Sequence, residues 1–126
     1  MKSRRVLVAE DDRVVSQQLA GLLRGRGYTP ILASDAMQTL MFAMREPHPD
    51  AILLDVNMPG GTGLEALRRL KASVKTSEIP VLVLSGETDP ALPETVRELG
   101  AVAFLAKPVD APTLLEALGK LHTDSP

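Results

Sequence analysis

The sequence predicts an α/β fold with one five-stranded parallel sheet, doubly wound, with helices on both faces. Five short apolar runs, beginning near Val6, Thr29, Ala51, Val81 and Val102, alternate with segments of helical period. This alternation is typical of βα units, which build parallel sheets. The connections are also short, and right-handed crossovers then favour the strand order 2-1-3-4-5 with helices above and below the sheet.

The length and composition are those of one globular domain. The chain has 126 residues, of which 44% are apolar and 24% charged. We expect residues 1–126 to form a single domain with a core over about residues 4–122, followed at 123–126 by a tail or the start of a linker.

The charge and cysteine content exclude several classes of function. A net charge of −2 gives no basic excess, so we expect no direct nucleic-acid binding. The chain has no cysteine, which excludes disulfides and thiolate metal sites and fits a reducing compartment. Residues 1–5 resemble the start of a secretory signal, but the apolar run that follows is far too short for a signal or a membrane span. We therefore expect a cytoplasmic protein with no membrane association.

Capping residues and breakers mark the expected helices. The first lies between Asp12 and Gly25, and the second begins after Ser34 or Asp35 and ends before Pro47. The third follows Thr62, the fourth contains Pro90 and Pro93 near its start and ends at Gly100, and the fifth is capped by Asp110. Met37, Met41 and Met44 recur at helical spacing in the second helix, and we expect them to fill the core.

Polar side chains follow four of the five apolar runs. Glu10 and Asp11 follow the first run, Asp55 ends the third, Ser85 ends the fourth and Lys107 follows the last. Taken singly, each has an ordinary explanation: a strand-end aspartate forms a turn, a serine caps one, and a lysine is a solvated surface charge. Because the carboxyl ends of parallel strands meet at one edge of the sheet, these side chains together predict a site.

The three carboxylates of this site predict a bound cation. Strand order 2-1-3-4-5 makes the first and third strands neighbours, so Glu10, Asp11 and Asp55 converge and would repel one another within about 4 to 6 Å. Oxygen ligands with free positions for water and phosphate favour Mg²⁺. Asp55 is then a candidate nucleophile toward phosphorus, and Lys107 would neutralise charge on the phosphoryl oxygens.

Four segments carry a resemblance to a known family. They are Val8-Ala9-Glu10-Asp11-Asp12, Leu53-Leu54-Asp55-Val56-Asn57-Met58-Pro59-Gly60, Leu84-Ser85-Gly86 and Phe104-Leu105-Ala106-Lys107-Pro108. Together they resemble the receiver domain of two-component response regulators, in particular those of the chemotaxis type, and the resemblance spans nearly the whole chain. It implies a flavodoxin-like (βα)5 sandwich.

The resemblance assigns roles to the site residues. It implies that Asp55 is the phosphoacceptor, and that Glu10, Asp11, Asp55 and the backbone carbonyl of Asn57 hold Mg²⁺. Lys107 would pair with the phosphoryl oxygens, and the Lys107–Pro108 bond would be cis.

The resemblance also assigns residues to the conformational switch and to the rate of dephosphorylation. By resemblance, the Ser85 hydroxyl would move toward the phosphoryl group, and Phe104, where tyrosine is more usual, would be the aromatic switch residue. Asn57 and Glu87 would flank the path of the hydrolytic water and so modulate dephosphorylation.

The implied function is a phosphorylation-dependent signalling switch. A histidine kinase or a histidine phosphotransfer protein would donate the phosphoryl group. Phosphorylation would then alter the binding of partner proteins to the face formed by the fourth helix, fifth strand and fifth helix. The chain would catalyse its own phosphorylation and dephosphorylation without being an enzyme that turns over a separate substrate. The alternative is a receiver-like interaction module that works without phosphorylation.

Two other classes fit the residues less well. A phosphatase of the haloacid dehalogenase type needs a general acid two residues after its aspartate, and Asn57 cannot donate a proton in that way. Flavodoxin-like cofactor binding needs a phosphate loop after the first strand, where the acids from Glu10 to Asp12 would repel a phosphate.

Overall fold

The predicted sheet is present in the computed structural model, which describes residues 4–58, 63–86 and 89–121. The strands are β1 (Arg4–Ala9), β2 (Tyr28–Ala33), β3 (Ala51–Asp55), β4 (Val81–Ser85) and β5 (Ala103–Ala106). They form one sheet in the order β2-β1-β3-β4-β5, and every neighbouring pair is parallel. The predicted fold class and strand order are confirmed.

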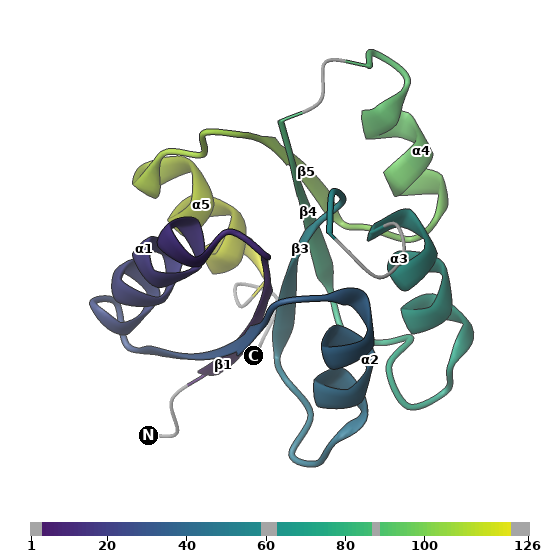
Figure 1. Cartoon of the computed structure of the whole chain (residues 1–126), viewed down its shortest axis with the longest axis horizontal. Helices are drawn as coiled ribbons and strands as arrows, with labels where there is room; N and C mark the ends of the chain where they lie inside the picture. Colours follow the sequence, from purple (N-terminus) through teal and green to yellow (C-terminus); the bar gives the residue numbers. More distant parts are fainter. Residues whose placement is uncertain (1–3, 59–62, 87–88, 122–126) are drawn as a thin grey trace.

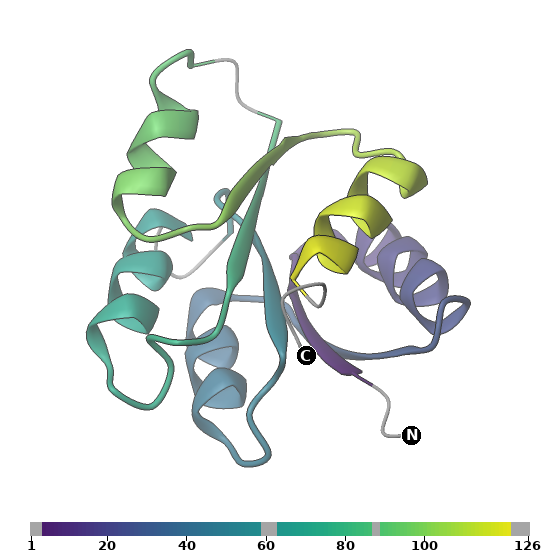
Figure 2. The ribbon, with the colours of Figure 1, turned by 180° about the vertical axis from the view of Figure 1, so that it is seen from behind.

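In the described residues, five helices cover the two faces of the sheet. They are α1 (Arg13–Arg24), α2 (Ala36–Met44), α3 (Gly63–Ala72), α4 (Leu92–Glu98) and α5 (Ala111–Lys120). Helices α1 and α5 lie on one face, and α2, α3 and α4 lie on the other (Figures 1 and 2). None of the helices in the described part of the chain is both long enough and apolar enough to cross a bilayer.

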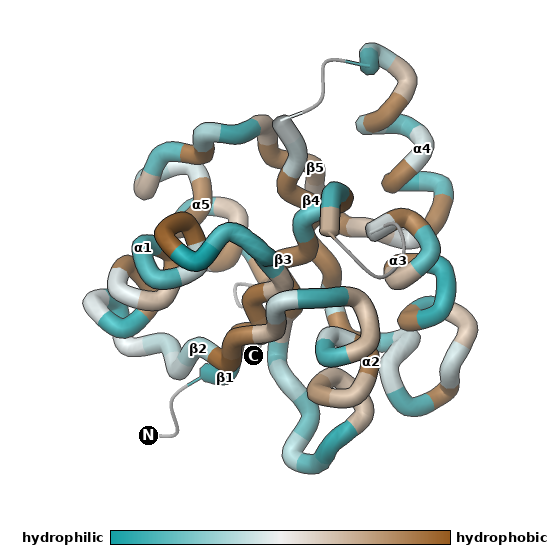
Figure 3. Tube along the Cα trace, in the orientation of Figure 1, coloured by the Kyte–Doolittle hydropathy of each residue, from teal (hydrophilic) through white to brown (hydrophobic). Residues whose placement is uncertain are grey.

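The alternation of side chains along each strand separates two cores. Leu7, Ile52 and Leu54 face α2, α3 and α4, whereas Val8 and Leu53 face α1 and α5. All five residues of β3 and of β4 are buried, because these central strands are covered on both sides. The hydrophobic segments of the chain accordingly run through the middle of the molecule (Figure 3).

The register of the sheet brings the ends of its strands together. Ala9 pairs with Leu54, and Asp55 pairs with Leu84, so β1, β3 and β4 end at nearly the same level. The residues that follow these ends therefore lie along one edge of the molecule.

The caps of three helices agree with the sequence analysis. Asp12, Asp35 and Asp110 each accept a backbone N–H from the first turn of α1, α2 and α5, respectively. A different constraint acts where α3 begins. A Cβ on Gly63 would lie 2.3 Å from Val56 Cα, so glycine permits the close approach of this helix to the end of β3.

The expectation for the methionines of α2 was wrong. The helix buries Ala36, Thr39 and Ala43, whereas Met37, Met41 and Met44 lie on its outer side with 71%, 51% and 44% of their surface exposed. Seven of the nine residues of α2 are apolar, so its sequence contains more than one apolar stripe, and small side chains let the helix lie close to its neighbours.

Candidate functional site

Three carboxylates converge at the carboxyl edge of the sheet. Glu10 and Asp11 follow β1, and Asp55 is the last residue of the neighbouring strand β3. Each offers an oxygen, and these oxygens lie within 4.8 Å of one another. Glu10 and Asp55 are each only 2% exposed, whereas Asp11 is exposed. Such a set of partly buried acids needs nearby positive charge.

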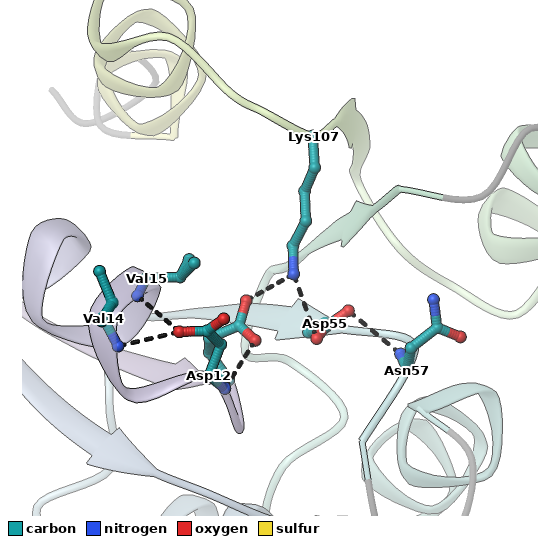
Figure 4. Close-up of polar contacts among 7 residues, drawn as sticks. Asp12, Val14, Val15, Asp55, Asn57 and Lys107 are labelled. Atoms are coloured by element: carbon teal, nitrogen blue, oxygen red, sulfur yellow. Dashed lines mark hydrogen bonds and ion pairs between the residues drawn. The ribbon is translucent and has the colours of Figure 1, made fainter.

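Two contacts fix the carboxylate of Asp55. Its Oδ1 accepts a hydrogen bond of 3.1 Å from the backbone N–H of Asn57, and its Oδ2 lies 3.2 Å from Lys107 Nζ (Figure 4). The N–H belongs to the turn after β3 and the ammonium to the residue after β5. The carboxylate is therefore oriented from two sides while it stands at the end of its strand.

Lys107 connects two of the three acids. Its Nζ lies 2.6 Å from Glu10 Oε1, in addition to the contact with Asp55. The other oxygen of Glu10, Oε2, accepts a hydrogen bond of 3.1 Å from the N–H of Asp12. Burial acts to lower the pKa of Lys107, but the hydrogen bond to Glu10 and the charge of Asp55 outweigh it and raise that pKa above the usual 10.5. The lysine is thus a firmly protonated cation between two buried carboxylates.

Backbone contacts place Lys107 beside Ser85. The Lys107 N–H donates a hydrogen bond of 2.8 Å to the carbonyl oxygen of Ser85, and the Ser85 side chain is buried at the end of β4. The Lys107–Pro108 peptide bond is cis, as the family resemblance implied. Asp55 and Ser85 therefore end the adjacent strands β3 and β4, and Lys107 follows β5, the next strand of the sheet.

Two more of the expected site residues, Asn57 and Phe104, belong to the described part of the chain. Asn57 is exposed, two residues after Asp55. Phe104 on β5 is half-buried and packs against the core on the α2, α3 and α4 face. Glu87 lies outside the described residues, as does the segment 59–62.

The donor set of the three acids fits Mg²⁺. The three side-chain ligands are all carboxylate oxygens, which hard cations prefer. Three such ligands leave coordination positions on the ion for water or a phosphoryl oxygen. Asp11 is the exposed member, so the acidic cluster opens to solvent on that side.

Two features of the site were not anticipated from the sequence. The first is the short Lys107–Glu10 ion pair, which joins residues 97 positions apart. The second is a groove of about 520 Å³ whose lining includes Val15, Gln18, Leu22, Val109 and Lys107 itself. The apolar stripe of α1 was visible in the sequence, but nothing there indicated that part of it borders the site.

Comparisons with known proteins agree with this geometry. The sequence model of the response regulator receiver domain matches residues 6–119. The chemotaxis response regulator CheY4 of Vibrio cholerae is 30% identical, with a TM-score of 0.87 over 95% of this chain and 99% of that one. The receiver domain of the sensor histidine kinase PA1611 from Pseudomonas aeruginosa, which has Mg²⁺ coordinated in its active-site cleft, is 28% identical, with a TM-score of 0.86 over 95% and 98% of the two chains.

A longer relative also contains the matching region. The sensory/regulatory protein RpfC of Xanthomonas campestris pv. campestris is 37% identical over 123 residues, which are 96% of this chain and 17% of that protein. The chain thus spans about one sixth of the length of this relative. From the match to the receiver model over most of its length, and from its sheet order and acidic strand ends, the chain belongs to the receiver domains of two-component response regulators.

Proposed function

We propose that the chain, as one domain over residues 1–126, is a phosphorylation-dependent signalling switch with Asp55 as its phosphoacceptor. The observation that carries this proposal is the Asp55 carboxylate, which stands at a strand end beside the Lys107 ammonium and two further acids. A nucleophile, a cation and a set of metal ligands in one place are the parts that phosphoryl transfer to a carboxylate needs.

The reaction transfers a phosphoryl group from a phosphohistidine to Asp55. A carboxylate oxygen of Asp55 bonds to phosphorus as the phosphorus–nitrogen bond breaks, and the leaving imidazole nitrogen keeps the electron pair. Lys107 would pair with the phosphoryl oxygens and offset their charge. Glu10, Asp11, Asp55 and the backbone carbonyl of Asn57 would hold Mg²⁺, which when bound neutralises further charge on those oxygens.

The donor is a histidine kinase or a histidine phosphotransfer protein. The groove beside the site supports this, because it combines apolar side chains of α1 and the β5–α5 turn with Lys107 of the site itself. A partner helix seated there would bring its histidine close to Asp55. The net charge of −2 and the absence of cysteine favour a cytoplasmic protein that contacts proteins and not nucleic acid.

The output would pass through Ser85 and Phe104 to the face of α4, β5 and α5. Ser85 is the buried last residue of β4, and β4 pairs with β3, so its hydroxyl would respond to a new phosphoryl group at the end of the adjacent strand. Phe104 lies on β5, with Lys107 three residues further along the chain, and packs toward the side of the sheet that α4 covers. If the phosphoryl group interacts more favourably with one of two conformations by a few kcal/mol, this is enough to shift their populations.

The first experiment is the intact mass of the protein after incubation with acetyl phosphate, with and without Mg²⁺. We expect a gain of one phosphoryl group that needs the metal and is absent in Asp55→Asn. Asp12→Asn is the matched control, because it removes a nearby carboxylate outside the three-acid cluster while asparagine still caps α1. Absence of the gain, under conditions that label another receiver domain, would favour the phosphorylation-independent interaction module.

A second experiment separates the donor groove from the chemistry. Leu22→Lys places a charge in the groove, away from the acids. We expect slower transfer from a phosphohistidine protein and unchanged labelling by acetyl phosphate, which needs no docked helix. Equal loss with both donors would mean that the substitution disturbs the fold and not the docking.

A further inference from the structure

Helix α2 carries an exposed, uncharged surface that the phosphoryl site does not use. Its nine residues, Ala36–Met44, include no charged side chain, and three of them are methionines with 71%, 51% and 44% of their surface exposed. Because the chain has five methionines and no cysteine, thioethers are its only sulfur groups. We call Met37, Met41 and Met44 the α2 methionine stripe.

The spacing of the stripe places all three thioethers on one side of the helix. Residues four and three positions apart are neighbours on a helix surface, so Met37, Met41 and Met44 form a row. The opposite side of α2 is anchored by residues that the stripe does not include. Ala36 and Ala43 are buried, and Thr39 donates a hydrogen bond of 2.8 Å from its hydroxyl to the carbonyl oxygen of Asp35.

Met58 is the contrasting thioether of the described residues. It is only 7% exposed and belongs to the core cluster on the α2, α3 and α4 face, three residues after Asp55. An oxygen atom added to its sulfur would place a polar group inside that core, beside the turn that orients Asp55. The same atom added to the stripe would stay in solvent.

We propose that the α2 methionine stripe is a modification site for peroxides, which oxidise Met37, Met41 and Met44 to sulfoxides before they reach Met58. In each step a sulfur lone pair attacks one oxygen of hydrogen peroxide, and the oxygen–oxygen bond breaks. The sulfur gains one oxygen, and the departing hydroxide takes up the remaining proton to form water, so the thioether is oxidised and the peroxide reduced. Reactivity follows exposure, since the sulfur must meet the oxidant in solution.

The modification changes the surface and leaves the fold intact. Each sulfoxide adds a strong hydrogen-bond acceptor to a helix face that is otherwise uncharged and apolar. The cap by Asp35 and the buried side chains of α2 do not involve the stripe. Oxidation therefore converts an apolar row into a polar one, and methionine sulfoxide reductases can reverse it.

The test is a peptide map of the full chain after limiting hydrogen peroxide, with sulfoxide quantified at each methionine. We expect each residue of the stripe to be oxidised on the order of five times faster than Met58, or more, and the far-UV circular dichroism to stay unchanged. Comparable rates at Met58 and the stripe would overturn the proposal, as would loss of helical signal when only the stripe is oxidised. Met1 lies outside the described residues and is followed as a separate peptide.

Two variants sharpen the result. The triple variant Met37→Leu, Met41→Leu and Met44→Leu keeps apolar side chains of similar size and should lower the rapid oxygen uptake by three atoms per chain. The matched variant Met58→Leu should leave the rapid uptake unchanged. If the triple variant takes up oxygen as fast as the unmodified chain, the stripe is not the reactive site.

Discussion

Lys107 lies closer to Glu10 than to Asp55: its Nζ is 2.6 Å from Glu10 Oε1 and 3.2 Å from Asp55 Oδ2. One cation therefore contacts both an acid of the proposed metal site and the proposed phosphoacceptor. In this arrangement it supplies part of the positive charge that the three clustered acids need. Mg²⁺ bound by the acids would thus share these carboxylates with Lys107, and the strength of each contact would depend on the other.

Removal of the Lys107 charge should affect metal binding and phosphorylation in opposite directions. A unit charge about 4 Å away is worth about 1 kcal/mol in water and about 4 kcal/mol near a protein surface, so Lys107→Met should tighten Mg²⁺ binding about tenfold or more. The same variant should slow labelling by acetyl phosphate by tenfold or more, because the phosphoryl oxygens lose their cation. Isothermal titration with Mg²⁺ and intact mass measure the two effects.

Lys107→Arg is the control for this prediction because it keeps the charge. It should bind Mg²⁺ about as the unmodified chain does. Unchanged metal affinity in Lys107→Met would contradict the idea that lysine and metal share Glu10.

Gly63 should be intolerant of a side chain. A Cβ there would meet backbone atoms at 2.3 Å (Val56 Cα) and 2.6 Å (Asp55 O), which no rotamer change can relieve. The start of α3 would have to move away from the end of β3, and we expect Gly63→Ala to lower the free energy of unfolding by about 2 kcal/mol or more. Urea denaturation measures this. Gly21→Ala is the matched control, since a Cβ at that helical position meets nothing within 4 Å.

Lys71 and Gly100 should be energetically coupled. Lys71 Nζ donates to the carbonyl oxygens of Ser77 at 3.0 Å and Ile79 at 2.7 Å, and burial lowers the pKa of this lysine although the charge of Glu78 opposes the shift. The anchored side chain lies against Gly100, where an added Cβ would come within 2.9 Å of Lys71 Cγ. Gly100 also has a φ of 108°, which disfavours any other residue.

A double-mutant cycle in urea tests this coupling. Gly100→Ala should be destabilising by about 1–2 kcal/mol from its backbone conformation alone, with a further loss from the contact with Lys71. In a Lys71→Ala background that further loss should disappear, which gives a coupling of about 0.5 kcal/mol or more. Additive effects would mean that the lysine side chain can move aside freely.

The cap of α5 should weaken in acid. Hydrogen bonds to Asp110 from the Thr113 hydroxyl at 2.7 Å and the Thr113 N–H at 3.1 Å lower the pKa of this carboxyl below its usual 3.8. A lowered folded pKa gives stability that is present above the unfolded pKa and is lost as the pH falls through the folded pKa. The difference in unfolding midpoint between the unmodified chain and Asp110→Ala should therefore shrink from about pH 6 to about pH 2.5. Asp110→Asn, whose cap does not titrate, should show a flatter pH dependence than the unmodified chain.

The sequence predicted the fold and the strand-end residues because both depend on strong, local signals. Apolar runs with breakers between them define βα units, and parallel strands must end on one side, so the convergence of Asp55 with Glu10 followed from topology alone. Capping by Asp12 and Asp110 was predictable for the same reason, since an N-cap acts within one turn.

Features that depend on side-chain packing were not predictable. Helix α2 is apolar on most of its surface, so periodicity could not distinguish the buried Ala36 and Ala43 from the exposed Met37 and Met41. Lys107 Nζ likewise lies closer to Glu10 than to Asp55 by less than one ångström, and strand order does not determine side-chain positions this finely.

The last prediction concerns the lifetime of the phosphorylated form. Asn57 lies two residues after Asp55 and is exposed, so its side chain can be changed without disturbing the core. A polar amide can hydrogen-bond a water that approaches the phosphorus, whereas an apolar side chain of similar size would exclude that water. We expect Asn57→Leu to slow loss of the phosphoryl group severalfold, measured by intact mass after acetyl phosphate is removed. Asn57→Gln, which keeps the neutral amide, should not prolong the lifetime, and an unchanged decay in Asn57→Leu would mean that water reaches the phosphorus by another path.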